Sequence, residues 1–229
     1  MADAAPRVTE DKLQVGDRDS HVSTIELAPP DPVAWMALAH GAGAGMRHAA
    51  MEAIAALLAE RGIATLRYQF PYMEQGRRGI SPRKLLLETV CAAAAAAAER
   101  AGGAPLLAGG KSMGGRMTSL AAAEGGLPGV RGIVFFGFPL HAAGKPSSER
   151  GDHLASLELP LLFLQGTRDK LAKLELLRPI CSRLPDATLV ELEGADHSFH
   201  VLKRSGRTDD EVLDEMGDHV TDWLSHGRW

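Results

Sequence analysis

Ser112 lies in the pattern Gly-x-Ser-x-Gly, between an apolar run and an alanine-rich run. On a sharp turn from a strand to a helix, such a serine projects its hydroxyl above the sheet. Its oxygen can then attack a carbonyl carbon once a base removes the proton. Glycine-rich turns without any catalytic role also join strands to helices in α/β proteins. Ser112 is therefore a candidate nucleophile whose assignment depends on a base and an acid elsewhere in the chain.

Asp169 and His197 have the side chains that would activate a serine. Asp169 follows the apolar residues 161–165, and His197 follows residues 187–193, which have the composition of a strand. Because the carboxyl ends of parallel strands meet at one edge of an open sheet, we expect both side chains near Ser112. His197 would accept the serine proton, and Asp169 would hold the imidazole ring. Taken singly, Asp169 also fits a helix N-cap and His197 a solvated loop residue.

Asp196 is a second acid, directly before His197 in the sequence. Adjacent side chains in an extended loop tend to point apart, whereas a carboxylate that follows the preceding strand can face the imidazole ring. We therefore expect Asp169, and not Asp196, to be the acid of the triad.

The glycine-rich residues 40–45 follow the first strongly apolar run of the chain. A turn of this kind can point backbone amides at a tetrahedral oxyanion. We therefore expect Gly41 and Ala42 to form an oxyanion hole together with the amide of Met113. His40 would then fix the turn through its ring hydrogen bonds instead of acting as the base. A plain flexible loop is the alternative.

Two other kinds of site find less support in the sequence. Residues 110–112 have the ending of a phosphate-binding P-loop, but Pro105 stands where that motif needs a glycine. His197 and His200 are three residues apart, but no third metal ligand accompanies them. We therefore expect neither a bound nucleotide nor a metal ion, and no organic cofactor is implied.

The elements that must position these residues alternate between strand and helix. The apolar segments typical of strands are 33–39, 63–70, 105–109, 130–138, 160–165 and 187–193. The segments with helical spacing or helix-forming composition are 46–61, 81–102, 113–124, 171–184 and 209–224. This order predicts an α/β fold with a mainly parallel sheet and helices on both faces. Residues 21–27 are a candidate antiparallel edge strand.

The length and composition of the chain limit how many domains it can form and which kinds of partner it can bind. With 229 residues, 45% of them hydrophobic, we expect a single domain over residues 21–229 after a flexible segment, 1–20. A formal net charge of −4 without a basic stripe argues against a nucleic-acid partner. No apolar run is long enough to span a bilayer, and residues 1–7 lack the apolar core of a signal peptide, so we expect a cytoplasmic protein. Cys91 and Cys181 are expected to be reduced, packed thiols.

The connection 140–159 is too short for a sizeable helical cap over the nucleophile, and residues 144–151 have the composition of an exposed loop. We therefore expect an open site that prefers short acyl esters. Three arginines, Arg77, Arg78 and Arg83, lie in the other long loop and could hold an acidic group of the substrate. A solvated loop is the alternative for them.

From about residue 31 to the C-terminus, the chain resembles the α/β-hydrolase superfamily, in which the order Ser, Asp, His is also found. It is similar to a small branch of predicted serine hydrolases related to the dienelactone hydrolases. The segments that carry the resemblance are 40–43, 71–74, 110–116, 138–141, 165–169 and 196–199. Dienelactone hydrolases carry a cysteine where this chain has Ser112, so their particular substrate does not transfer.

The resemblance implies an enzyme that hydrolyses carboxylic esters or related acyl bonds of a small-molecule substrate through Ser112, His197 and Asp169. The same resemblance reaches a subunit of an animal chromatin-modifying complex. A non-catalytic interaction or scaffold module with the same fold is therefore the alternative, and an activated serine discriminates between the two.

Overall fold

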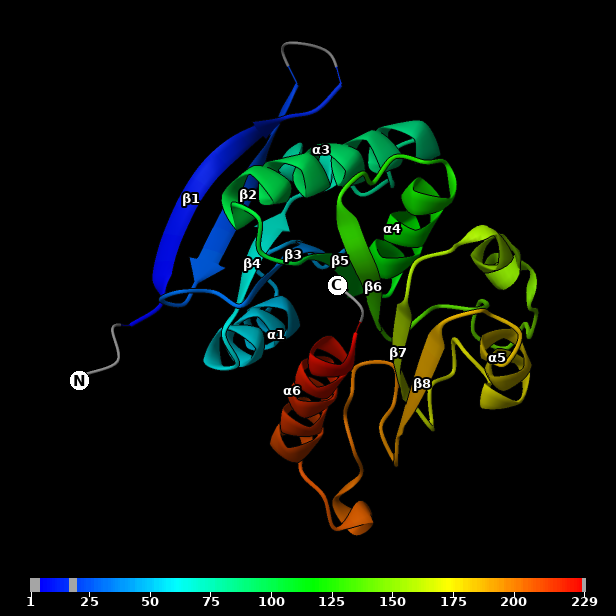
Figure 1. Cartoon of the computed structure of the whole chain (residues 1–229). Helices are drawn as coiled ribbons and strands as arrows, with labels where there is room; N and C mark the ends of the chain where they lie inside the picture. The colour runs from blue at the N-terminus through cyan, green and yellow to red at the C-terminus, as the bar shows by residue number, and fades with distance from the viewer. Residues whose placement is uncertain (1–4, 17–19, 228–229) are drawn as a thin grey trace.

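A computed structural model describes residues 5–16 and 20–227 and contains an eight-stranded sheet in the order β1-β2-β4-β3-β5-β6-β7-β8 (Figure 1). The strands are β1 (Arg7–Gln14), β2 (His21–Ala28), β3 (Ala34–Ala39), β4 (Ile63–Tyr68), β5 (Leu106–Lys111), β6 (Val130–Phe136), β7 (Leu161–Gly166) and β8 (Ala187–Leu192). In the part of the sheet that runs β4-β3-β5-β6-β7-β8, every neighbouring pair is parallel. The pairs β1–β2 and β2–β4 are antiparallel. The predicted mainly parallel sheet is confirmed.

Helices cover both faces of this sheet. They are α1 (Ala49–Glu60), α2 (Pro71–Glu74), α3 (Arg83–Ala101), α4 (Met113–Ala123), α5 (Leu174–Cys181) and α6 (Asp209–His226), with 3₁₀ turns η1 (Glu149–Ser156) and η2 (Lys203–Ser205). Helices α3 and α4 lie on one face, and α1 and α6 lie on the other (Figure 1). Along β3, Ala37 packs toward α3 and α4, while the adjacent Met36 and Leu38 pack toward α1 and α6. This alternation follows from the two-residue period of a strand.

The central strands are buried along their whole length. Every residue of β3, β4, β5 and β7 is buried, because helices exclude water from both faces of the sheet. The strands therefore have mainly apolar sequences, which is why their positions can be predicted. Their carboxyl ends form one edge of the sheet, from which the loops with the candidate catalytic residues emerge.

The N-terminal part of the sheet differs from the expectation. Residues 7–14, expected in a flexible segment, form β1, and β2 is an interior strand between β1 and β4 instead of the edge. Seven of the eight β1 residues are exposed, so β1 has no apolar alternation by which a strand is recognised. Residues 1–4 and 17–19 of the expected flexible segment lie outside the described residues. The single domain over residues 21–229 stays a prediction.

Several element boundaries also move. Helix α3 begins at Arg83, with Pro82 as its N-cap, instead of at residue 81, and α5 is shorter than the predicted helix 171–184. The connection 140–159 contains η1, part of which falls in the segment expected to be loop. The thiols of Cys91 and Cys181 form no disulfide. None of the helices built from the described residues combines the length and the apolar character needed to cross a membrane.

Candidate active site

Ser112 occupies a sharp turn between β5 and α4. Its φ of 52° and ψ of −117° lie in a region that residues with side chains rarely adopt. A Cβ atom on Gly110 would lie 2.3 Å from the carbonyl oxygen of Ala39, and one on Gly114 would lie 2.5 Å from the same atom. Only glycine at both positions lets β5 and α4 come this close to β3. The turn that presents Ser112 is therefore fixed by backbone packing.

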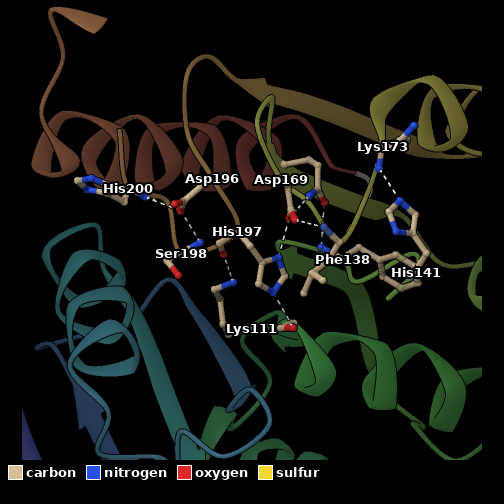
Figure 2. Close-up of polar contacts among 12 residues, drawn as sticks. Lys111, Phe138, His141, Asp169, Lys173, Asp196, His197, Ser198 and His200 are labelled. Atoms are coloured by element: carbon tan, nitrogen blue, oxygen red, sulfur yellow. Dashed lines mark hydrogen bonds and ion pairs between the residues drawn. The ribbon is translucent and has the colours of Figure 1, made fainter. Parts of the chain in front are cut away.

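His197 connects the serine to a carboxylate. Its Nε2 lies 2.8 Å from Oγ of Ser112, and its Nδ1 lies 2.6 Å from Oδ2 of Asp169 (Figure 2). A carboxylate can only accept, so the Nδ1–H group donates to Asp169, and Nε2 is left to accept the Ser112 hydroxyl proton. The structure thus brings together three residues from the loops after β5, β7 and β8 and hydrogen-bonds them in series.

The Asp169 carboxylate is fully buried, with 0% of its side chain exposed. Its Oδ2 also accepts a hydrogen bond from Nε2 of Gln165 at 2.5 Å, and its Oδ1 accepts one from the Leu171 amide at 2.7 Å. Oε1 of Gln165 accepts from the Phe138 amide at 2.9 Å, which fixes the orientation of the Gln165 side chain. Asp169 therefore faces His197 in one geometry. Sequence reasoning missed Gln165, although a glutamine inside an apolar strand is a usable signal.

Lys111 is a second buried polar residue that sequence reasoning missed. Its Nζ donates to the His197 carbonyl oxygen at 2.5 Å (Figure 2). The same Nζ lies 4.8 Å from the ring centroid of Phe199. Burial lowers the pKa of Lys111 to about 8, while the carboxylates of Asp169 and Asp196 oppose this shift. Lys111 thereby ties the loop that contains His197 to the end of β5, directly before Ser112.

Asp196 lies beside His197 in the sequence but does not contact its ring in the structure. Its Oδ1 accepts from the amides of Ser198 at 2.8 Å and His200 at 3.1 Å, so it holds the turn of its own loop. His200 instead contacts Asp209, with Nδ1 2.9 Å from Oδ2. In the described part of the chain, no group of three or more His, Cys, Asp or Glu side chains is arranged to hold a metal ion.

The turn after β3 lies against the serine. A Cβ atom on Gly41 would be 3.7 Å from Cβ of Ser112. His40 is buried, and its Nδ1–H donates to the Gly41 carbonyl oxygen at 2.7 Å while its Nε2 accepts from the Phe70 amide at 3.0 Å. Burial lowers the pKa of His40 to about 4, so the ring is neutral near pH 7. His40 therefore fixes the turn, as expected.

The amides of Ala42 and Met113 donate to no other described residue. Both residues line a cavity of about 460 Å³ that also contains Ser112. The remaining lining residues are Ile80, Ser81, Arg83, Leu86, Arg116, Met117, Leu120, Pro139, Arg150 and Leu171. Of the three loop arginines singled out in the sequence, Arg83 lines this cavity, and Arg77 and Arg78 do not.

The sequence matches the family described as an alpha/beta hydrolase domain over residues 32–225. The chain belongs to this alpha/beta hydrolase family. The match covers all the segments on which the expected resemblance rests, from the turn after β3 to the loop with His197. Membership of the α/β-hydrolase superfamily is confirmed, and the fold is similar to that of solved dienelactone hydrolases.

Solved structures of this fold span nearly the whole chain. A dienelactone hydrolase from Anabaena variabilis is 20% identical, with a TM-score of 0.77, over 98% of this chain and 99% of that chain. An α/β serine hydrolase without a lid from Xanthomonas campestris is 19% identical, with a TM-score of 0.70, over 93% of this chain and 94% of that chain. The esterase domain of a Rhodothermus marinus protein is 19% identical, with a TM-score of 0.69, over 95% and 97% of the two chains. At these identities the likeness shows the fold alone.

Proposed function

We propose that this α/β-hydrolase family member cleaves carboxylic esters or related acyl bonds of small molecules. Ser112 is the nucleophile, His197 the general base and Asp169 the acid that orients the histidine. The observation that carries the proposal is the hydrogen-bonded series itself, with 2.8 Å between Ser112 and His197 and 2.6 Å between His197 and Asp169. An arrangement of this kind activates a serine hydroxyl near neutral pH.

In the proposed acylation step, one proton moves from Ser112 to His197 and then to the leaving group. As Oγ of Ser112 attacks the carbonyl carbon, its proton passes to Nε2 of His197, and the buried Asp169 stabilises the imidazolium that forms. The imidazolium then gives this proton to the leaving oxygen, which departs as an alcohol. The acyl group remains on Ser112 until water, activated by the same ring, releases it as a carboxylic acid.

The tetrahedral intermediate carries its negative charge on the former carbonyl oxygen. We assign the stabilisation of this charge to an oxyanion hole that consists of the backbone amides of Ala42 and Met113, together with Gly41, which lies in the same turn as Ala42. The support for this assignment is that these two amides donate to no other described residue and border the cavity at Ser112. Donors of this kind, placed in advance, contribute about 2.7–4 kcal/mol each to the barrier reduction.

A small-molecule substrate fits the space available. The cavity volume of about 460 Å³ is in the range of small-ligand sites. The connection 140–159 contributes η1, eight residues long, and no larger helical cap. The cytoplasmic location predicted from the sequence is also part of the proposal.

A series of p-nitrophenyl esters from acetate to palmitate tests this function. We expect kcat/KM to be highest for short acyl chains, because the site lacks a long apolar tunnel in which each further methylene would gain about 0.8 kcal/mol. Ser112→Ala should lower kcat by about a thousandfold or more while the protein stays folded. A rise of kcat/KM toward palmitate would contradict the open site, and a Ser112→Ala variant with wild-type turnover would contradict the mechanism.

A further inference from the structure

The cavity at Ser112 has an unusual charge balance. Three of its lining residues, Arg83, Arg116 and Arg150, are cationic, and no aspartate or glutamate is among its described lining residues. The rest of the lining is largely apolar and includes Met117 and Leu120. A neutral ester needs no such concentration of guanidinium groups beside the nucleophile.

Arg83 has a partner outside the cavity. Its Nη2 forms an ion pair with Oε1 of Glu124 at 2.6 Å, and 59% of its side chain is exposed. Arg83 thus already has an anionic partner outside the cavity. Arg83 therefore does not explain the charge of the site by itself.

Arg116 and Arg150 are different, because neither forms an ion pair with any described residue. Nε of Arg116 is buried and has no hydrogen-bond partner among the described residues. Burial lowers the pKa of Arg116, and the charges of Arg150 and Arg83 lower it further. A half-buried cation without a partner, facing a second cation, is costly unless an anion neutralises it.

The positions of the two arginines tie this charge to the reacting atoms. Arg116 is one helical turn after Ser112, since its amide donates to the Ser112 carbonyl oxygen at 3.1 Å. Residues four apart share one face of a helix, about 6 Å apart along its axis. Arg150 comes from η1, a short element that also contributes to the lining of the cavity. Both arginines therefore line the cavity that contains Ser112.

A neighbouring histidine adds no charge at neutral pH. His153, also on η1, has Nε2 2.8 Å from Oγ of Ser119 on α4. Burial lowers the pKa of His153 to about 4, and the charges of Arg116 and Arg83 lower it as well. The contact between His153 and Ser119 thus holds η1 against α4 as a neutral hydrogen bond.

Resting on the function proposed above, we propose that Arg116 and Arg150 form an anion-binding subsite, and that the preferred substrate is a short ester carrying a carboxylate or phosphate group. Guanidinium groups bind both anions through paired hydrogen bonds. The apolar lining at Met117 and Leu120 would contact the short carbon chain between the ester and the anion. The anion would occupy the place that no acidic side chain of the described chain fills.

Two matched pairs of esters test this subsite. The p-nitrophenyl monoester of glutarate is compared with p-nitrophenyl hexanoate, which has a neutral acyl chain of similar length. A 4-carboxyphenyl acetate is compared with phenyl acetate, so that an anion on the leaving group is also tested. We expect a preference of about tenfold to a hundredfold in kcat/KM for the anionic member of at least one pair. Equal kcat/KM within both pairs would overturn the proposal.

For each arginine variant, the quantity to compare is this preference, the ratio of kcat/KM for the anionic ester to kcat/KM for the neutral ester. Arg116→Met and Arg150→Met should each lower it about tenfold, Arg116→Lys should restore part of it, and Arg77→Met should leave it unchanged. Arg77 is the matched control because it is exposed and does not line the cavity. A preference that survives in the Arg116→Met, Arg150→Met double variant would assign the charge selectivity elsewhere and contradict the proposal.

A binding measurement separates this proposal from the proposed function. Glutarate should bind the Ser112→Ala protein in a calorimetric titration and bind at least tenfold more weakly to the Arg116→Met, Arg150→Met double variant. Hydrolysis of the neutral esters through Ser112 without glutarate binding would overturn the subsite alone. Arginine-dependent glutarate binding without any ester hydrolysis would support the subsite and contradict the proposed function.

Discussion

The loops after β7 and β8 both bring an aspartate close to His197, and the two aspartates have different tasks. Asp169, in the loop after β7, is fully buried and accepts three hydrogen bonds, one of them from the His197 ring. Asp196, in the loop after β8, is half-buried and accepts only from amides of its own loop. The acid suited to orient the base is therefore the one that faces the ring across the sheet edge, and not its neighbour in the sequence.

Burial explains why this difference matters for chemistry. In a site that excludes water, a hydrogen bond from an imidazole ring to a carboxylate is electrostatically stronger than at the surface. Asp169 can therefore fix the tautomer of His197 and stabilise its protonated form. Water screens the half-buried Asp196, which is left to shape the loop. The comparison predicts a steep ranking of variants around His197.

The largest effect is expected for Asp169→Asn. Oδ2 of Asp169 accepts from both His197 and Gln165, and Oδ1 accepts from the Leu171 amide. In either orientation, an amide would place its NH₂ group against at least one of these donors. We expect kcat to fall by about 10⁴-fold, the loss seen when the carboxylate of a serine protease triad becomes an amide. Steady-state kinetics on p-nitrophenyl acetate measures it, and a loss below tenfold would remove Asp169 from the triad.

A smaller effect is expected for Lys111→Met. Lys111 acts as a positioning residue, because its Nζ holds the carbonyl oxygen of His197 and not the reacting atoms. Without this bond the loop after β8 can shift, and a displacement of about 1 Å in a catalytic group costs up to about a hundredfold in rate. We expect kcat to fall about 10- to 100-fold with little change in KM. The exposed Lys173→Met is the control, and a change confined to KM would contradict the positioning role.

The smallest effect is expected for Asp196→Asn. The side-chain oxygen of an asparagine can still accept from the amides of Ser198 and His200, so the turn can keep its shape. We expect kcat within about threefold of wild type and a loss of at most about 1 kcal/mol in the free energy of unfolding. Urea unfolding and ester kinetics on the same preparation measure both. A loss of activity greater than that of Asp169→Asn would transfer the triad assignment to Asp196.

The sequence predicts most of the fold because the central strands are buried on both faces and the segments between them have helical spacing or composition. Strand β1 escaped prediction because nearly all its residues are exposed, so only its backbone pairing with β2 defines it. The same missing strand explains why β2 was expected at the edge of the sheet. Pairing between backbones leaves no mark in a sequence when neither face is buried.

For the site, sequence reasoning identified Ser112, Asp169 and His197 from residue type and position after a strand, and the structure brings these three side chains together. It did not identify roles for Gln165, Lys111, Arg116 or Arg150. Their contacts depend on which side chains from distant segments meet at the sheet edge, and on whether a charge there finds a partner. Spacing along one segment does not contain that information.

Covalent labelling with a fluorophosphonate, followed by intact mass and peptide mapping, tests the central claim most directly. We predict one phosphonate adduct per chain, on Ser112, with no adduct on a folded Ser112→Ala variant and strongly slowed labelling of Asp169→Asn. The probe reacts with a serine only where a base activates it. A folded wild-type protein that stays unlabelled, as expected for a non-catalytic scaffold, or an adduct on another residue, would contradict the account.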